Sequence, residues 1–372
     1  MPADFVFTDE HHELRKTVRA FLEKRSDEKA VRALMASARG YDPEVWKQLA
    51  EELGLAGLII PEEHGGAGFG PIELLIAMEE MGRALLCAPF LGTSVCAARA
   101  LLECADGVTQ KELLAKIAAG AAVVSVAHAE PNGRWDLAGI TLRAKGVGPS
   151  VTLDGEKTLL LDGHVADVLL VVARGDAGLE LLRVDAGAAG LTRESIPALD
   201  LTRKLARVRF SRTPATRVSS GDQTANLERV LAFTCAALAA EQVGGAQKCL
   251  ELATDYAKSR LQFGRPIGSY QGIKHKCAEM LVAVEMAKSA AYNALFIAAA
   301  NEPDFVEAAH LAKAYCSEAY FHAAADNIQI HGGMGFTWEA SPHLYFKRAK
   351  ASDLLFGDAA HHREELAKHV GL

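Results

Sequence analysis

The stretch "YAKSRLQFGRPIGSYQGIKHKCAEM", residues 256–280, decides how this sequence is interpreted. A long helical pattern ends in Arg260-Leu-Gln-Phe-Gly, and Pro266 cannot continue a helix. A new helix is expected to begin near Gln271. On local grounds the stretch predicts a helix hairpin. A second segment, residues 327–339, adds functional information to this stretch.

The second segment is "NIQIHGGMGFTWE", residues 327–339, in which Gly332, Gly333 and Gly335 follow a predicted helix. Glycines at such a place allow a phosphate or a ring to approach the backbone closely. The structural alternative is a Schellman-type helix cap, which requires one glycine rather than three.

Composition limits the class of protein. A chain of 372 residues is long enough for two or three domains, and its net charge of -7 gives no reason to expect nucleic acid as a partner. No signal-peptide pattern and no uncharged run of about twenty apolar residues is visible, so a cytoplasmic protein without a membrane span is expected. Scattered cysteines without a CxxC pair indicate free thiols in a reducing compartment; they are Cys87, Cys96, Cys104, Cys235, Cys249, Cys277 and Cys316.

Three segments with different hydrophobic patterns follow one another along the chain. Residues 1–120 have helical periodicity, and residues 121–220 contain short apolar runs with the spacing of an antiparallel sandwich or barrel. Residues 221–372 return to helical periodicity, in four stretches at about 223–263, 270–300, 303–331 and 340–369. The predicted fold is therefore α+β, with an N-terminal helical domain, a middle antiparallel β domain and a C-terminal four-helix bundle.

Local signals add detail to this prediction. Thr8 and Asp42 are expected N-caps, and Thr109 with Glu112 has the pattern of a capping box. The glycine-rich stretch at 62–71 lacks the spacing of a phosphate-binding loop and predicts a tight turn between helices. Adjacent histidine pairs cannot both face one ion well from a helix, and no HExxH occurs, so no metal site is expected.

Taken together, these segments resemble the acyl-CoA dehydrogenase family almost from end to end. The stretches "FVFTDEHHELRKTVRAFL", "WKQLAEELGLAGLIIPEEHGGAGFG" and "EEMGRALLCAPF" look like the family's N-terminal helical domain. The combination of R-x-x-F-G at 260–264 with Q-x-x-G-G-x-G at 329–335 is specific. The resemblance implies a flavoenzyme in which a carboxylate removes the α-proton of an acyl-CoA thioester while the β-hydride passes to the flavin.

The resemblance also implies which residues bind FAD. In the family, the C-terminal helical domain pairs across a dimer interface and holds the adenosine and pyrophosphate end of the neighbouring subunit's FAD. A guanidinium suits a phosphate and an aromatic ring suits adenine. The positions implied are Arg260, Gln262, Phe263, Gln271, Gln329, Gly332 and Gly333.

Departures from the family pattern concern the flavin ring. The family's Thr-Glu-Pro segment appears here as "HAEPNGRWD", with Ala129 in the threonine position. Its Trp-Ile-Thr segment appears as "GEKTLLLDG", with Leu159 and Leu161 in place of the tryptophan and threonine. Leucine cannot hydrogen-bond to a flavin edge, so the resemblance is weakest where the ring would lie.

The catalytic glutamate is missing as well. Of the family's two positions for it, one corresponds to Gly357 and the other, thirteen residues before Gln247, to Thr234. Three carboxylates could substitute. Glu228 lies six residues, nearly two turns, before Thr234. Asp358 follows Gly357, and Glu241 lies in an apolar helical run where a glutamate needs either a structural partner or a functional reason.

Three hypotheses follow. The first is a partner subunit of a heteromeric acyl-CoA dehydrogenase that completes a sister subunit's FAD site, similar to the degenerate subunit of α2β2 enzymes of bacterial steroid side-chain breakdown. The second is a self-sufficient homo-oligomer that uses Asp358 or Glu241 as its base. The third is a flavin-free structural homologue. The resemblance implies acyl-CoA as substrate and electron-transfer flavoprotein as electron acceptor.

Overall fold

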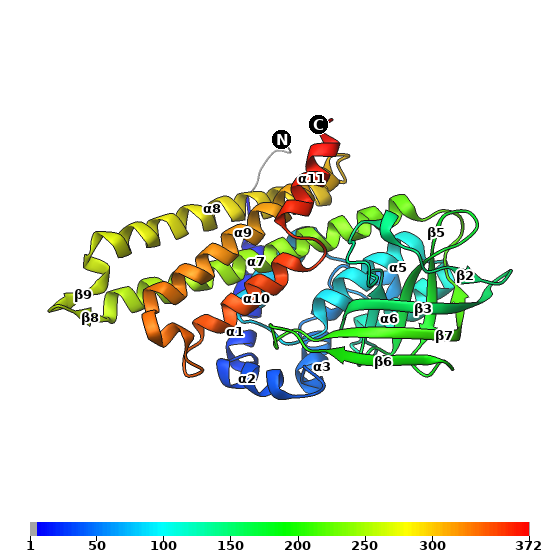
Figure 1. Ribbon diagram of the computed structural model, residues 1–372, viewed down its shortest axis with the longest axis horizontal. Helices are drawn as coiled ribbons and strands as arrows, with labels where there is room; N and C mark the ends of the chain where they lie inside the picture. The colour runs from blue at the N-terminus through cyan, green and yellow to red at the C-terminus, as the bar shows by residue number, and fades with distance from the viewer. Residues whose placement is uncertain (1–5, 372) are drawn as a thin grey trace. The chain divides into compact units, whose positions relative to one another are not determined.

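The computed structural model describes residues 6–371 and confirms the α+β class, with helices before and after the strands along the chain (Figure 1). The helices before the strands are α1 (Asp9–Arg25), α2 (Glu28–Ala36), α3 (Pro43–Glu51), α4 (Pro71–Arg83), the π-helix η3 (Phe90–Ala97), α5 (Ala98–Cys104) and α6 (Gly107–Ala118). Short 3-10 segments are η1 (Leu55–Gly57), η2 (Glu62–His64), η4 (Leu137–Gly139) and η5 (Ile267–Ser269).

Two of the three predicted helix starts are confirmed. The side chains of Thr8 and Asp42 accept hydrogen bonds from the first turns of α1 and α3. The prediction of a capping box at Thr109 was wrong. Asp106 is the N-cap of α6, and its side chain accepts from the backbone N–H of Thr109 at 2.9 Å. An aspartate placed directly before the first helical residue competes successfully for the same orphan N–H groups.

The strands form one sheet in the order β1-β4-β5-β7-β3-β2, with β6 paired to β7. All these pairs are antiparallel, as predicted, except β1 with β4, which is parallel. Parallel neighbours require a crossover, and here the chain forms β2 and β3 before it returns as β4. The strands are β1 (Val124–Ala127), β2 (Ala144–Lys145), β3 (Ser150–Leu161), β4 (Val168–Arg174), β5 (Leu179–Asp185), β6 (Leu191–Ile196) and β7 (Leu205–Arg217).

Strand β4 is apolar from Val168 to Ala173 because both of its faces are covered. Val168, Leu170 and Val172 belong to one hydrophobic core, which also contains residues of α5 and α6. The alternate residues Leu169 and Val171 belong to a second core, which contains residues of β3 and β7. The period of two along the strand thus divides the side chains between two cores.

The helices after the sheet differ from the prediction in one respect. They are α7 (Thr224–Ser259), α8 (Gln271–Ala300), α9 (Phe305–His331), α10 (Pro342–Leu354) and α11 (Ala359–His369), with the small hairpin β8 (Leu261–Gln262) and β9 (Arg265–Pro266) after α7 and the 3-10 turn η6 (Gly332–Phe336) after α9. The single fourth helix expected at 340–369 is in fact two helices. The chain breaks around Gly357, whose φ of +104° no helix can contain.

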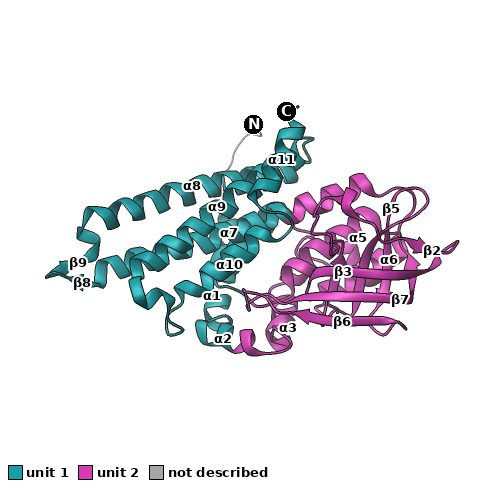
Figure 2. Cartoon of the chain, in the orientation of Figure 1, with its two compact units in different colours: residues 1–32, 71–86, 235–372 teal, residues 33–70, 87–234 magenta. Residues whose placement is uncertain are grey.

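The chain divides into two compact units, shown in Figure 2. The helical unit comprises residues 1–32, 71–86 and 235–372, and the sheet unit comprises residues 33–70 and 87–234. Each unit is therefore built from segments that are distant in the sequence.

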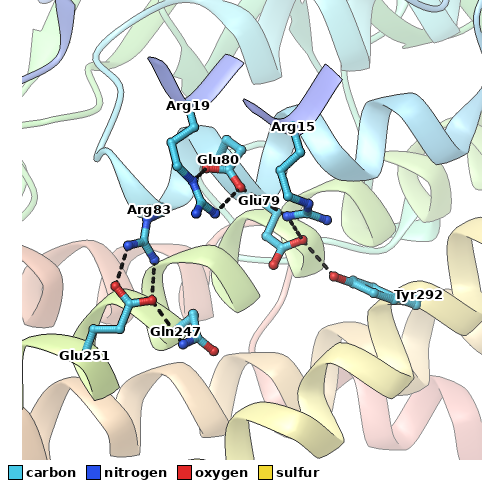
Figure 3. A network of polar contacts seen from close by, with 8 residues as sticks. All are labelled: Arg15, Arg19, Glu79, Glu80, Arg83, Gln247, Glu251 and Tyr292. Carbon is cyan, nitrogen blue, oxygen red and sulfur yellow. Dashed lines mark hydrogen bonds and ion pairs between the residues drawn. The ribbon is translucent and has the colours of Figure 1, made fainter. Parts of the chain in front are cut away.

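Arginine–glutamate pairs tie α1, α4 and α7 of the helical unit together. Figure 3 shows two arginines of α1 pointing towards two carboxylates of α4, while an arginine at the end of α4 meets a glutamate of α7. Paired charges of this kind tolerate burial because each carboxylate keeps its hydrogen bonds. The pairs are Arg15–Glu79 (2.7 Å), Arg15–Glu80 (3.1 Å), Arg19–Glu80 (2.7 Å) and Arg83–Glu251 (2.6 Å), with Tyr292 of α8 donating to Glu79 at 2.8 Å.

Candidate functional site

The hairpin after α7 presents Phe263 at its tip. Gln262 and Arg265 are paired across a two-residue turn in which Phe263 and Gly264 have φ of +52° and +78°. Positive φ at both positions is the geometry of a tight hairpin, which glycine adopts freely but phenylalanine adopts only under strain. The Phe263 side chain is also 92 % exposed. A strained and exposed aromatic residue indicates a binding role rather than a packing role.

Neighbouring side chains hold this hairpin in place. The hydroxyl of Tyr270 donates to the carbonyl of Gln262 at 3.1 Å, and the guanidinium of Arg265 lies 4.1 Å from the Tyr270 ring centroid. Arg260 and Gln271 flank the hairpin and are both exposed. Within residues 6–371, no hydrogen bond or ion pair engages the Arg260 guanidinium, so it is available to an anion.

The three glycines after α9 have different reasons to be glycine. Gly332 ends the helix with a φ of +62°, and a Cβ on Gly335 would lie 2.8 Å from the carbonyl oxygen of Ile328. Gly333 has neither constraint: its φ is not in the left-handed region, and nothing in the described chain lies within 4 Å of an added Cβ. Its backbone is therefore open to a ligand. Gln329, in the last turn of α9, is exposed beside it.

The donor set at this end of the helical unit fits the adenosine diphosphate part of FAD. It combines a free guanidinium for phosphate, an exposed ring for adenine, and amide groups beside bare backbone. The residues predicted from the resemblance thus remain exposed rather than being used in packing; they are Arg260, Gln262, Phe263, Gln271, Gln329, Gly332 and Gly333.

The positions corresponding to the flavin ring, in the sheet unit, do not fit in the same way. Ala129 is buried, and its carbonyl accepts from the backbone N–H of Thr158 at 2.9 Å. Leu159 lies in a bulge of β3 with a φ of +56°, and the Leu161 carbonyl accepts from the Ser125 hydroxyl at 2.7 Å. None of these three side chains can hydrogen-bond to a flavin.

A buried ion pair lies beside these positions and has a structural role. The ammonium group of Lys157 is fully buried and donates to Glu130 at 2.8 Å and to the carbonyl of His128 at 2.9 Å. Glu130 also accepts from the backbone N–H of Thr141 and of Leu142. Burial lowers the pKa of Lys157 to about 8, against the raising effect of Glu130. Every charge here is satisfied within the chain.

The turn between α10 and α11, which we call the corner, has no space for a side chain at Gly357. A Cβ on Gly357 would overlap the imidazole of His361, and the φ of +104° would strain any other residue. The buried ammonium of Lys313 donates to the carbonyls of Gly357 (3.0 Å) and Asp353 (2.9 Å), and also to the hydroxyl of Ser317 (3.0 Å). Burial lowers the pKa of Lys313 to about 8. The turn is thus anchored from α9 and has no room for a glutamate.

Of the three substitute carboxylates, Glu228 is exposed, whereas Asp358 and Glu241 are engaged in structural contacts. Asp358 is exposed and caps α11 by accepting from the backbone N–H of His361 at 2.8 Å. Glu241 is buried and accepts from Arg348 at 2.9 Å, while Arg348 also donates to the Leu86 carbonyl at 3.2 Å. Both carboxylates therefore already accept hydrogen bonds within the fold.

Thr234, the second position that corresponds to the family's catalytic glutamate, has no basic side chain either. The hydroxyl of Thr234 donates to the carbonyl of Val230 in its own helix at 2.8 Å. Among the described residues, no group of three or more His, Cys, Asp or Glu side chains could hold a metal ion.

Three residues important to these sites were missed by sequence reasoning. Lys313 and His361 define the corner, and Tyr256 stacks on His331 beside the glycine turn. The histidine pair at 361–362 was a visible signal, because the first of the pair lies four residues after Gly357 and can reach back across one turn. The contact of Lys313 with Gly357 could not be predicted from a local pattern, since the two residues are 44 positions apart in the sequence.

Comparison with known proteins gives concordant matches. The family model described as acyl-CoA dehydrogenase, N-terminal domain, matches residues 8–121, and that described as acyl-CoA dehydrogenase, C-terminal domain, matches residues 224–371. The chain is 36 % identical over 362 residues to acyl-CoA dehydrogenase IpdE2 of Mycolicibacterium smegmatis, covering 97 % of this chain and 98 % of the relative.

Solved structures agree with these matches. A variant of the Tcur3481–Tcur3483 steroid ACAD superposes with a TM-score of 0.90 at 29 % identity, covering 97 % of this chain and 98 % of that one. The ChsE4–ChsE5 complex of Mycobacterium tuberculosis superposes with a TM-score of 0.91 at 25 % identity, covering 99 % and 98 %.

Proposed function

Because the chain belongs to the acyl-CoA dehydrogenase family, whose members are FAD-dependent oxidoreductases, we propose that it is the partner subunit of a heteromeric acyl-CoA dehydrogenase. In this role it completes the FAD site of a sister subunit. One observation carries the proposal. The residues for the adenosine end of FAD are exposed and unused, whereas the positions for the flavin ring and for the base have lost their functional groups.

The residues of this chain then bind and orient rather than transfer protons. Arg260 pairs with the diphosphate, Phe263 packs on the adenine, and Gly333 allows close approach of the backbone. FAD, when bound, supplies the acceptor for the substrate hydride. The base and the ring contacts come from the sister subunit, acyl-CoA is the substrate, and electron-transfer flavoprotein accepts the electrons in the cytoplasm.

Two of the similar structures support a heteromer. Both are described by the names of two chains, and one of them is a steroid ACAD. A steroid-derived acyl-CoA is therefore the substrate class that we propose for the assembled enzyme. The proposed heteromer requires a sister chain that carries the threonines and tryptophan of the flavin-ring positions and the catalytic glutamate, all of which this chain lacks.

The self-sufficient homo-oligomer is the weaker alternative. It needs Asp358 or Glu241 as the base, and these residues cap α11 and neutralise Arg348, respectively. Moving either carboxylate to a substrate would leave a helix without its cap or deprive a buried arginine of its carboxylate partner.

The deciding experiment measures flavin per chain together with native mass, first on this chain alone and then after coexpression with a sister chain. Flavin that appears only in the mixed assembly, at less than one FAD per chain, supports the proposal. One FAD per chain in a homo-oligomer that turns over acyl-CoA would overturn it. In that case Asp358→Asn and Glu241→Gln would identify the base.

A further inference from the structure

An aromatic stack joins the two elements that carry the proposed adenosine site. The ring of Tyr256, near the end of α7, lies parallel to the imidazole of His331, the last residue of α9. Their centroids are 4.2 Å apart, with an angle of 22° between the planes. In Figure 1 the ends of these two helices and the β8–β9 hairpin lie at the same end of the helical unit.

Each ring is directly connected to one half of the site. The carbonyl of Tyr256 accepts from the backbone N–H of Arg260 at 2.8 Å, so this residue sets the start of the hairpin. His331 directly precedes Gly332, and its Nδ1 lies 2.8 Å from the carbonyl of Asn327. That contact requires a proton on Nδ1 and fixes the imidazole orientation. Burial lowers the pKa of His331, which keeps the ring neutral at pH 7.

We propose that Tyr256 and His331 are positioning residues that set the spacing between the Arg260 hairpin and the Gly332–Gly333 turn. This inference rests on the proposed function, because it takes the adenosine diphosphate of FAD as the ligand that touches both elements. A ligand held from two sides binds tightly only where the two sides are already correctly spaced. Loss of the stack lets the helix ends move independently, and binding of FAD must then restore their spacing.

The test compares FAD with FMN, which lacks the adenosine part, on the apo form of the mixed assembly. Dissociation constants are measured by quenching of flavin fluorescence. Tyr256→Leu is expected to weaken FAD binding by about tenfold, from a stacking pair of ordinary strength. FMN binding should not change. Tyr256→Phe keeps the stacked ring and should stay within about twofold of the wild type.

Further variants distinguish a failure of the positioning role of Tyr256 and His331 from a failure of the proposed function. His331→Leu removes the other ring and should reproduce the tenfold loss; it also decides the matter if Tyr256→Leu does not fold. An equal loss of FAD and FMN binding would overturn the inference, as it would indicate general damage. If Arg260→Ala weakens FAD binding but both leucine variants do not, the inference fails while the proposed function stands. If Arg260→Ala has no effect, the proposed function itself fails.

Discussion

At the scale of single residues, Gly333 and Gly335 show how one turn can combine a functional and a structural glycine. A Cβ on Gly335 would press against the Ile328 carbonyl, so the fold needs this glycine. A Cβ on Gly333 would meet only open space. Gly333 also lies beside the exposed Gln329, so its open backbone is accessible to a ligand.

We therefore predict opposite effects for the two alanine variants. Gly333→Ala should leave the free energy of unfolding unchanged or raise it by up to about 1 kcal/mol, because alanine restricts the unfolded chain. It should nevertheless weaken FAD binding about tenfold in the mixed assembly, since a methyl group would block the close approach. Gly335→Ala, the matched control, should lower the melting temperature. Unaltered FAD affinity in Gly333→Ala would refute the proposed contact.

At the scale of elements, α4 and α7 cross with their backbones in contact. A Cβ on Gly244 would overlap the carbonyl of Glu79, and one on Gly82 would overlap the carbonyl of Glu241. This close approach also brings Arg83 of α4 to Glu251 of α7. The crossing thus depends on the two glycines and supports the polar network of Figure 3.

Gly244→Ala should destabilise the protein by about 1–3 kcal/mol, because the helices must separate to admit the methyl group. Alanine in a helix interior is normally favoured over glycine by up to about 1 kcal/mol. A decrease in the free energy of unfolding of Gly244→Ala would therefore indicate steric overlap at the crossing. Gly107→Ala in the first turn of α6, where nothing lies within 4 Å, is the control and should not destabilise. Urea denaturation of both variants measures the difference. A stabilised Gly244→Ala protein would contradict the crossing.

The contact of α11 with α9 contains two histidines from which we expect a dependence of stability on pH. His362 of α11 is buried against His310 of α9, with their Nδ1 atoms 2.8 Å apart. Burial, together with the charge of Lys313 and the neighbouring His310 and His361, lowers the pKa of His362 to about 2. Burial lowers the pKa of His310 to about 4, although Glu365 opposes this and His369 and Lys368 reinforce it. Both imidazoles are therefore neutral in the folded protein at pH 5.

Stability should consequently fall as the pH drops below about 6.5, where histidines of the unfolded chain take up protons that the folded chain excludes. At pH 5 each such histidine removes about 2 kcal/mol, from about 1.4 kcal/mol per pH unit. His362→Gln should reduce the slope of unfolding free energy against pH by about one proton. The exposed His12→Gln is the control. Equal slopes in wild type and His362→Gln would disprove the assignment.

At the scale of the whole molecule, helix α8 has an apolar face that the described part of the chain leaves uncovered. By length and composition α8 could cross a membrane, the one helix in residues 6–371 that qualifies, but it packs along α9 and α4 in the helical unit. Val282 is 63 % exposed and Met286 54 % exposed, one turn apart on the same side. We expect this face to be covered by another acyl-CoA dehydrogenase subunit.

Replacement of both residues, as Val282→Asp with Met286→Asp, should lower the native mass of the assembly, because burial of two carboxylates in an apolar contact is unfavourable. The far-ultraviolet circular dichroism should be preserved, since neither side chain is buried in the chain. Val147→Asp, at a loop residue of the sheet unit that is 98 % exposed, serves as the control. Native mass spectrometry provides the measurement, and an intact assembly in the double variant would rule out this interface.

The sequence by itself was sufficient for features that depend on residues close together in the chain. Caps at Thr8 and Asp42 and the glycine turn after α9 follow from local backbone preferences. The break between two helices at 260–270 was predicted as well, whereas the small β8–β9 hairpin that forms there was not. The helix–strand–helix order followed from hydrophobic periodicity, which reports on burial along each element. The positions that correspond to the family's functional residues could then be proposed by counting along the chain.

Only the tertiary structure decided what the remaining candidates do. Glu241 is neutralised by Arg348, 107 residues away, and the Gly357 turn is anchored by Lys313 and filled by His361. The parallel pairing of β1 with β4 likewise depends on where the chain crosses over. Local patterns predict which elements form, but the partner of a buried charge and the space around a glycine are set by segments that meet only on folding.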